Sequence, residues 1–155
     1  MDKSSLKTAQ LSRHVGIFFI CVVLLSGCQN QNTATATIDG KVFYLETART
    51  AGQKAKGLSG RNFLASHSGM IFLYDQPQTL SFWMKDTLIP LQIIFVNGCE
   101  IVDIQKMSVE PNPSNPQKTY VSKYPADKAI EVNMNFVPEN IVGQKIDELC
   151  YQSTD

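Results

Sequence analysis

The sequence lacks several features that mark common protein classes. It carries 14 Lys+Arg against 14 Asp+Glu, so it has no cationic excess of the kind that a nucleic-acid partner requires. It has only 2 His and no Cys-x-x-Cys pair, which argues against a metal site and against thioredoxin-like redox chemistry. No internal repeat and no heptad pattern is present. We therefore expect no nucleic acid, no metal and no cofactor.

What is present is enough apolar sequence for one folded domain. Hydrophobic residues make up 43% of the 155 residues, which argues against a long disordered chain. A chain of this length is typical of a single domain. The apolar residues are spread unevenly, however, and one concentration lies at the N-terminus.

Residues 1–27 have the organisation of a signal peptide. Lys3, Lys7 and Arg13 form a basic start, and the uncharged apolar stretch 15–25 follows them. This stretch has the length of a signal-peptide core and is shorter than the ~20 residues that span a bilayer. We therefore expect an exported protein rather than a membrane-spanning helix.

The end of this segment, Leu25-Ser26-Gly27-Cys28, resembles the lipobox of bacterial lipoproteins. The resemblance implies that Cys28 is lipidated, becomes the first residue of the mature chain and attaches it to the membrane through acyl chains. Gln29, rather than Asp, follows Cys28, which favours the outer membrane, facing the periplasm, if the organism is Gram-negative. Residues 28–37 are small and uncharged and are expected to form a flexible tether.

Two further cysteines, Cys99 and Cys150, remain in the mature chain. In an exported protein such a pair suggests a disulfide, and two free thiols are the alternative. A bridge between them would close a long loop and add roughly 4 kcal/mol to the free energy of unfolding.

Residues 38–150 are predicted to form one domain of short strands, followed by a tail at 151–155. Asp39-Gly40 and Asn97-Gly98 are typical of β-hairpin turns, and Thr50 with Gln53 is typical of a helix N-terminus. The predicted strands are 36–46 as a hairpin, 69–74, 80–84, 89–96, 99–104, 128–134 and 144–149; the predicted helical segments are 50–58 and 138–142. This pattern predicts an α+β domain with a mostly antiparallel sheet or small barrel and one or two short helices.

Several blocks of this domain resemble, in order and spacing, the domain-of-unknown-function family 192. They are Gly57-Leu58 with Arg61, Gly69 to Phe72, Phe82 to Leu91, and Tyr120 to Ala126 followed by Ile130-Glu131. The resemblance covers about residues 38–149 and implies a small exported or lipid-anchored α+β module with no established activity. The family usually has Glu at Gln53, Met at Ser59, Asn at Asp86 and Asp at Gln92. An amide at position 92 cannot exchange a proton near neutral pH, which argues against catalysis through that position.

Two residues with the same strand parity, Trp83 and Lys85, are candidates for a ligand pocket. An indole beside an ammonium group can stack a ring or sugar and bind an anionic group. The alternative is that Trp83 belongs to the core and that Lys85 extends to solvent. Asp86 is either part of the same patch or a cap for the turn that follows.

Glu131 lies in an apolar strand, where a buried carboxylate needs a partner or a shifted pKa. It is a candidate for a core ion pair or for an acid/base group. Arg61 is either a ligand-binding residue or a structural partner of Glu131 or Asp86.

The leading hypothesis is a lipid-anchored exported binding or interaction domain, more readily a binding protein than an enzyme. Its patch consists of Arg61, Trp83, Lys85, Asp86 and Glu131, and its partner is a small ligand or an envelope protein. One alternative is a hydrolase that acts on an envelope substrate through Glu131 or Asp86. Another is a structural lipoprotein whose segment 111–116 docks a partner.

Overall fold

The computed structural model describes residues 33–150. The predicted signal peptide, the lipidation site Cys28 and the tail at 151–155 lie outside the described residues. Within residues 33–150, eight strands form two sheets. The larger sheet has the strand order β1 (Thr33–Ile38), β2 (Lys41–Ala48), β3 (Ser68–Gln78), β8 (Ala126–Asn133), β5 (Leu91–Asn97) and β6 (Glu100–Met107). The smaller sheet pairs β4 (Ser81–Trp83) with β7 (Thr119–Val121).

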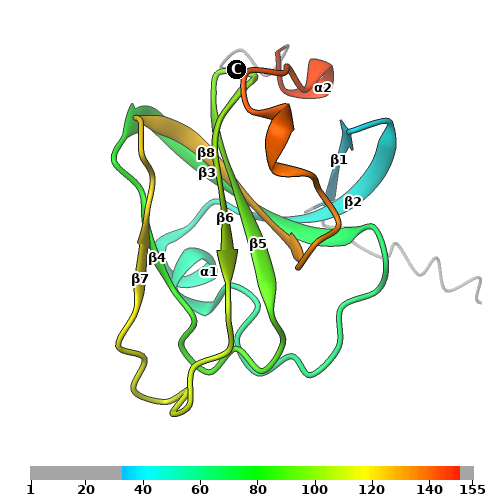
Figure 1. Cartoon of the computed structure of the whole chain (residues 1–155). Helices are drawn as coiled ribbons and strands as arrows, with labels where there is room; N and C mark the ends of the chain where they lie inside the picture. The colour runs from blue at the N-terminus through cyan, green and yellow to red at the C-terminus, as the bar shows by residue number, and fades with distance from the viewer. Residues whose placement is uncertain (1–32, 151–155) are drawn as a thin grey trace, which may run out of the picture. The chain divides into compact units, whose positions relative to one another are not determined.

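The prediction of a mostly β domain with short helices is confirmed. The large sheet is mostly antiparallel, as predicted, but it is mixed, because β2 and β3 run parallel. The reason is the connection between them: helix α1 (Ala51–Lys56) and the loop 57–67 carry the chain back to the end of the sheet where β2 began. The sheet also does not close into a barrel, because β1 and β6 are its two edge strands (Figure 1).

Both predicted hairpins are present. Asp39 and Gly40 have φ values of 51° and 71°, which a tight two-residue turn between β1 and β2 requires. β1 begins earlier than the sequence suggested, because residues 33–37, assigned to the tether, pair with β2. Their Thr-Ala alternation is that of a half-buried strand, with Ala36 and Ile38 in the core.

The predicted last strand at 144–149 is wrong. Only Lys145 makes an isolated bridge, to Glu100, and helix α2 (Asp147–Cys150) follows. Ile146 immediately precedes α2 and its carbonyl accepts from the Leu149 N–H at 3.0 Å, and both side chains are buried. The helical turn predicted at 138–142 is present as the 3₁₀-helix η1 (Glu139–Ile141).

The two faces of the large sheet are covered by different elements. We call one the sealed face. Its sheet residues are mainly aliphatic, and they pack against η1, α2 and the segment that precedes η1. The sheet contributes Leu45, Ile71, Ile94, Ile130 and Val132, and the covering elements contribute Val137, Ile141, Ile146 and Leu149. We call the other the open face. It is rich in aromatic residues and methionine, and it is covered by β4, β7 and the segment after α1. The sheet contributes Met70, Phe72, Ile93 and Phe95, and the covering segments contribute Leu58, Phe82, Met84 and Tyr120. Figure 1 shows α1 near β4 and β7.

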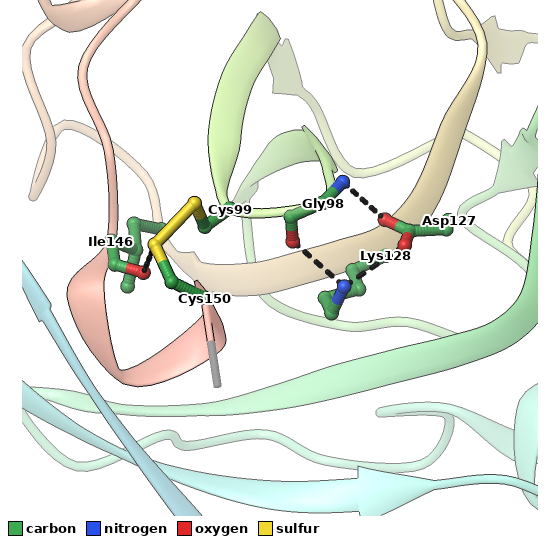
Figure 2. Close-up of a disulfide and its surroundings, with 6 residues drawn as sticks. All are labelled: Gly98, Cys99, Asp127, Lys128, Ile146 and Cys150. Atoms are coloured by element: carbon green, nitrogen blue, oxygen red, sulfur yellow. Dashed lines mark hydrogen bonds and ion pairs between the residues drawn. A yellow bond between two sulfur atoms is a disulfide. The ribbon is translucent and has the colours of Figure 1, made fainter. Parts of the chain in front are cut away.

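A disulfide between Cys99 and Cys150 ties α2 to the hairpin of β5 and β6, and the two Cα atoms are 4.8 Å apart. Figure 2 shows that the same hairpin tip is also bound to β8. Lys128 donates to the Gly98 carbonyl at 2.7 Å and pairs with Asp127 at 3.0 Å, and Asp127 accepts the Gly98 N–H. One hairpin tip thus joins the sheet to the helix that covers its sealed face.

Candidate functional site

Glu131 is a carboxyl group in the apolar interior of the open face. It lies in the middle of β8, opposite Met70 on β3 and Ile93 on β5, and it is 5% exposed. Within residues 33–150 no hydrogen bond or ion pair reaches its carboxylate, and burial alone raises its pKa to about 8. Glu131 is therefore protonated at neutral pH and presents an O–H donor.

The backbone holds Glu131 in place through a close approach of two strands. A Cβ on Gly69 would collide with the Glu131 carbonyl oxygen and would lie 2.9 Å from the Leu45 side chain. Only glycine fits at this point, because any side chain would push β3 away from β8. The position of Glu131 is thus fixed by a rigid part of the sheet.

A small cleft opens over the Glu131 side chain. Its volume is about 20 Å³, and it is enclosed by α1 and the residues just after it on one side and by the end of β4 on the other. Its lining residues are Lys54, Ala55, Lys56, Gly57, Leu58, Phe72, Trp83, Lys85, Thr87 and Glu131. The structure therefore brings together three residues that the sequence predicted as one site: Trp83, Lys85 and Glu131.

Helix α1 is positioned by the capping box that the sequence predicted. The Thr50 side chain accepts from the Gln53 N–H at 3.2 Å, and the Gln53 side chain accepts from the Thr50 N–H at 3.0 Å. Gln53 thus makes both contacts of the box with an amide in place of a carboxylate. Gly57, with a φ of 48°, ends the helix. No residue of α1 is buried, so its lysines lie on the surface around the cleft.

Trp83 is at the mouth of the cleft rather than in the core. Phe82 and Met84 point into the core, while Trp83 is 55% exposed, so the core interpretation of Trp83 is wrong. The Lys85 ammonium lies 5.5 Å from the centre of the indole ring, within the range of a cation–π contact. The predicted same-side arrangement of Trp83 and Lys85 is present.

Arg61 does not join this cleft. Its guanidinium donates to both carboxylate oxygens of Glu46, at 2.6 and 2.7 Å, so the predicted pairing with Glu131 or Asp86 is wrong. Met70 stands between Glu46 and Glu131 in the strand register, which keeps the two carboxyl groups apart. The Arg61–Glu46 hydrogen bonds raise the pKa of Arg61 and lower that of Glu46. Arg61 lines a separate groove of about 380 Å³.

Asp86 is also absent from the residues that line the cleft. It has a φ of 51°, and its backbone joins two loops: its carbonyl accepts from Gly60 at 2.7 Å and its N–H donates to Pro113 at 2.8 Å. The Thr87 hydroxyl donates to the Lys85 carbonyl at 3.2 Å in the same turn. Asp86 therefore lies in a turn, but within residues 33–150 no hydrogen bond of its side chain caps that turn.

The sequence did not reveal three residues near Glu131. Lys54 and Lys56 line the cleft, and the Lys54 ammonium lies 3.9 Å from the centre of the Tyr74 ring. Burial, and then the charge that Glu131 carries when ionised, raise the pKa of Tyr74. The capping box located the helix that carries the lysines, but nothing in the sequence indicated which strand that helix covers.

The arrangement combines a neutral acid at the base of the cleft, lysines around it and an exposed indole at its mouth. It is suited to binding a small polar group, and the Glu131 proton is also available for acid catalysis. Residues 33–150 contain no cluster of three or more His, Cys, Asp or Glu that could hold a metal ion. In that range no helix is long and apolar enough to cross a membrane.

The fold and the cleft define a small α+β domain with one buried, unpartnered acid. The family described as DUF192, Uncharacterized ACR, matches residues 34–147, and the chain belongs to this family. No curated protein matches the chain.

Two solved structures share the fold. A protein described as a proposed transcription regulator from Sinorhizobium meliloti 1021 has 22% sequence identity and a TM-score of 0.60, over 72% of this chain and 88% of that chain. A protein of unknown function from Novosphingobium aromaticivorans DSM 12444 has 28% identity and a TM-score of 0.57, over 74% of this chain and 82% of that chain. These similarities concern the fold.

Proposed function

We propose that this chain is an exported lipoprotein whose domain binds a small ligand in the cleft over Glu131. The observation that supports the binding role is the Glu131 carboxyl itself, which is 5% exposed, without a partner from residues 33–150, and at the base of a cleft. The oxygens of this carboxyl are reached from the cleft, where either water or a ligand can hydrogen-bond to them. Trp83 and Lys85 add an apolar and a cationic contact at the mouth.

The attachment to the membrane rests on the N-terminal sequence. Residues 1–27 are the signal peptide, and acyl chains on Cys28 hold the domain at the membrane, which in a Gram-negative cell is the outer membrane, facing the periplasm. Expression in a Gram-negative host tests this. We expect the protein in the membrane fraction with the mass of a triacylated chain that begins at Cys28, and Cys28→Ala should abolish the modification. A soluble wild-type protein with an unmodified Cys28 would refute the anchoring.

The binding role can be tested directly, because Trp83 is the only tryptophan of the chain. We expect saturable quenching of its fluorescence by at least one member of a panel of envelope saccharides, peptidoglycan fragments and nucleotides. Glu131→Gln and Lys85→Met should each weaken that binding about tenfold. Phe63→Ala is the matched control, because Phe63 is an exposed aromatic residue that lines the other groove. If no member of the panel quenches Trp83, or if both cleft variants bind as wild type does, the proposal fails.

A second candidate is a hydrolase that acts on an envelope substrate, supported by the pKa of about 8 that keeps Glu131 protonated as a general acid. Most glycoside hydrolases need a second carboxylate about 5 to 10 Å away. Glu131 is the only carboxylate among the residues that line the cleft, and Asp86 lies in the turn outside it. Turnover of peptidoglycan fragments that is abolished by Glu131→Gln would favour the hydrolase over the binding protein. Turnover that survives Glu131→Gln combined with Asp86→Asn would exclude both residues.

A further inference from the structure

The size of the cleft limits what can enter it. A volume of about 20 Å³ holds roughly one water molecule, so only a group of one or two heavy atoms can reach Glu131. The rest of any ligand must lie outside, over the exposed residues at the mouth. The ligand is therefore a larger molecule that is recognised through one small terminal group.

The mouth of the cleft offers a flat apolar surface beside a positive charge. The Trp83 indole is 55% exposed, and the Lys85 ammonium is 5.5 Å from its centre. An exposed indole stacks against the apolar face of a flat or cyclic group, and the neighbouring ammonium favours an anionic substituent on that group.

The charges around the cleft complement an anion. Lys54 and Lys56 from α1 and Lys85 from the turn after β4 line the cleft, while Glu131 on β8 is neutral at pH 7. The Lys54 ammonium lies 3.9 Å from the centre of the Tyr74 ring and the Lys85 ammonium 5.5 Å from that of Trp83, so the positive charge is at the rim and not beside Glu131. Tyr74 on β3 is a further titratable group near Glu131, and its pKa is raised. A carboxylate at the mouth would meet this positive charge, and one of its oxygens could accept the Glu131 O–H at the base of the cleft.

We propose that the cleft recognises an acidic saccharide, whose ring stacks on Trp83 and whose carboxylate lies between Lys85 and the Glu131 hydroxyl. The inference rests on the proposed binding function and adds to it the chemical class of the ligand. No covalent step is involved. Binding depends on the proton of Glu131, because an ionised Glu131 would repel the carboxylate and could no longer donate to it.

The test compares two sugars that differ by one acidic group. N-acetylmuramic acid carries a carboxylate on a lactyl ether, and N-acetylglucosamine has the same ring without it. Titrations followed by Trp83 fluorescence should give about tenfold tighter binding of the acid at pH 7. Its affinity should fall about tenfold between pH 7 and pH 9, because the pKa of Glu131 is about 8. Binding of N-acetylglucosamine should change little over the same range.

Two variants separate Glu131 from its neighbours. Glu131→Gln should bind the acid with an affinity that no longer depends on pH between 7 and 9, whereas a pH dependence that came from Tyr74 or another neighbour would persist in this variant. Lys85→Met should remove most of the preference for the acid over the neutral sugar. Circular dichroism of each variant checks that it is folded.

Equal binding of the two sugars, or a pH dependence that survives in Glu131→Gln, would overturn the inference. The broader panel distinguishes this failure from failure of the binding function. If a neutral saccharide or a nucleotide quenches Trp83 and the acidic sugar does not, the cleft is a binding site for another class of ligand. If no ligand of the panel binds, the proposed binding function itself is wrong.

Discussion

Gln92 and Glu131 are both polar side chains buried in the large sheet, on neighbouring strands but on opposite faces. Gln92 lies on the sealed face and is 0% exposed, and both ends of its amide are bonded to Val137. Its NH₂ donates to the Val137 carbonyl at 2.7 Å, and its oxygen accepts the Val137 N–H at 3.2 Å. Glu131 lies on the open face without a partner from residues 33–150.

The difference separates a polar group that the fold satisfies from one that has no partner within residues 33–150. The hydrogen bonds of Gln92 attach the segment before η1 to the sheet, so its burial costs little free energy. The position where family members usually have Asp therefore serves the fold here and lies on the face away from the cleft. Burial of Glu131 destabilises its charged form, and the fold provides no compensation. A ligand that supplies the missing partner would recover part of that free energy.

The largest expected change in the free energy of unfolding comes from the sealed face, where the Cys99–Cys150 disulfide holds α2 against the sheet. The bond spans 51 residues, so replacing both cysteines by alanine should lower the free energy of unfolding by about 4 kcal/mol. Urea unfolding measures this loss, and reductant should destabilise the wild type but not the variant. The native fluorescence of Trp83 should be unchanged, because the bond lies outside the open face. A loss below about 1 kcal/mol would show that packing alone holds α2.

A pH titration sharpens the comparison on the open face. Burial raises the pKa of Glu131 from its ordinary value of 4.5 to about 8 in the folded chain, so the unfolded state loses its proton first as the pH rises. Stability should therefore fall as the pH rises from 4.5 to 8 and then level off. Between pH 5 and pH 8 the contribution of Glu131 to this fall is roughly 3 kcal/mol.

Glu131→Gln should remove this contribution. Glu46→Gln is the control: its carboxylate has a lowered pKa, so its stabilisation is lost only as the pH falls through the folded pKa. The control variant should keep the wild-type slope between pH 5 and pH 8. Urea unfolding at each pH, followed by Trp83 fluorescence, measures the three slopes. Identical slopes for the wild type and Glu131→Gln would mean that Glu131 finds a partner in solution.

Substitution by leucine should change the free energy of unfolding in opposite directions at Gln92 and at Glu131. Gln92→Leu leaves the buried N–H and C=O of Val137 without their partner and should destabilise the domain by about 2 kcal/mol. Glu131→Leu removes a buried acid and should stabilise it at pH 8. Denaturant unfolding of both variants at pH 8 makes the comparison. If both changes destabilise equally, the distinction between the two polar groups is wrong.

The parts of the fold that the sequence predicted are those decided by local chemistry. Asp39-Gly40 specifies a hairpin because both residues adopt positive φ, and Thr50 with Gln53 specifies the start of α1. The prediction at 144–149 fails because a short stretch with two apolar residues fits a strand or a helical turn equally well. Packing of Ile146 and Leu149 against the sealed face decides between them.

The site was predicted in part for the same reason. Trp83 and Lys85 are two residues apart, so strand parity was enough to place them together. Their meeting with Glu131 depends on how β4 lies over β8, and the pairing of Arg61 with Glu46 depends on the parallel register of β2 and β3. These contacts join residues far apart in the sequence, and no local pattern encodes them.

The smallest expected effect on stability belongs to Trp83. Its ring is more than half exposed, so Trp83→Ala should change the free energy of unfolding by no more than about 0.5 kcal/mol. Circular dichroism must follow this unfolding, since the variant has no tryptophan. Phe63→Ala, at 74% exposure, is matched in size and accessibility and should be equally mild. The two variants should differ in calorimetric titration with N-acetylmuramic acid, where Trp83→Ala loses binding and Phe63→Ala keeps it. A large loss of stability in Trp83→Ala would instead show that the indole packs against the open face. A structural role would then be enough to explain why Trp83 lies at the cleft, without a ligand.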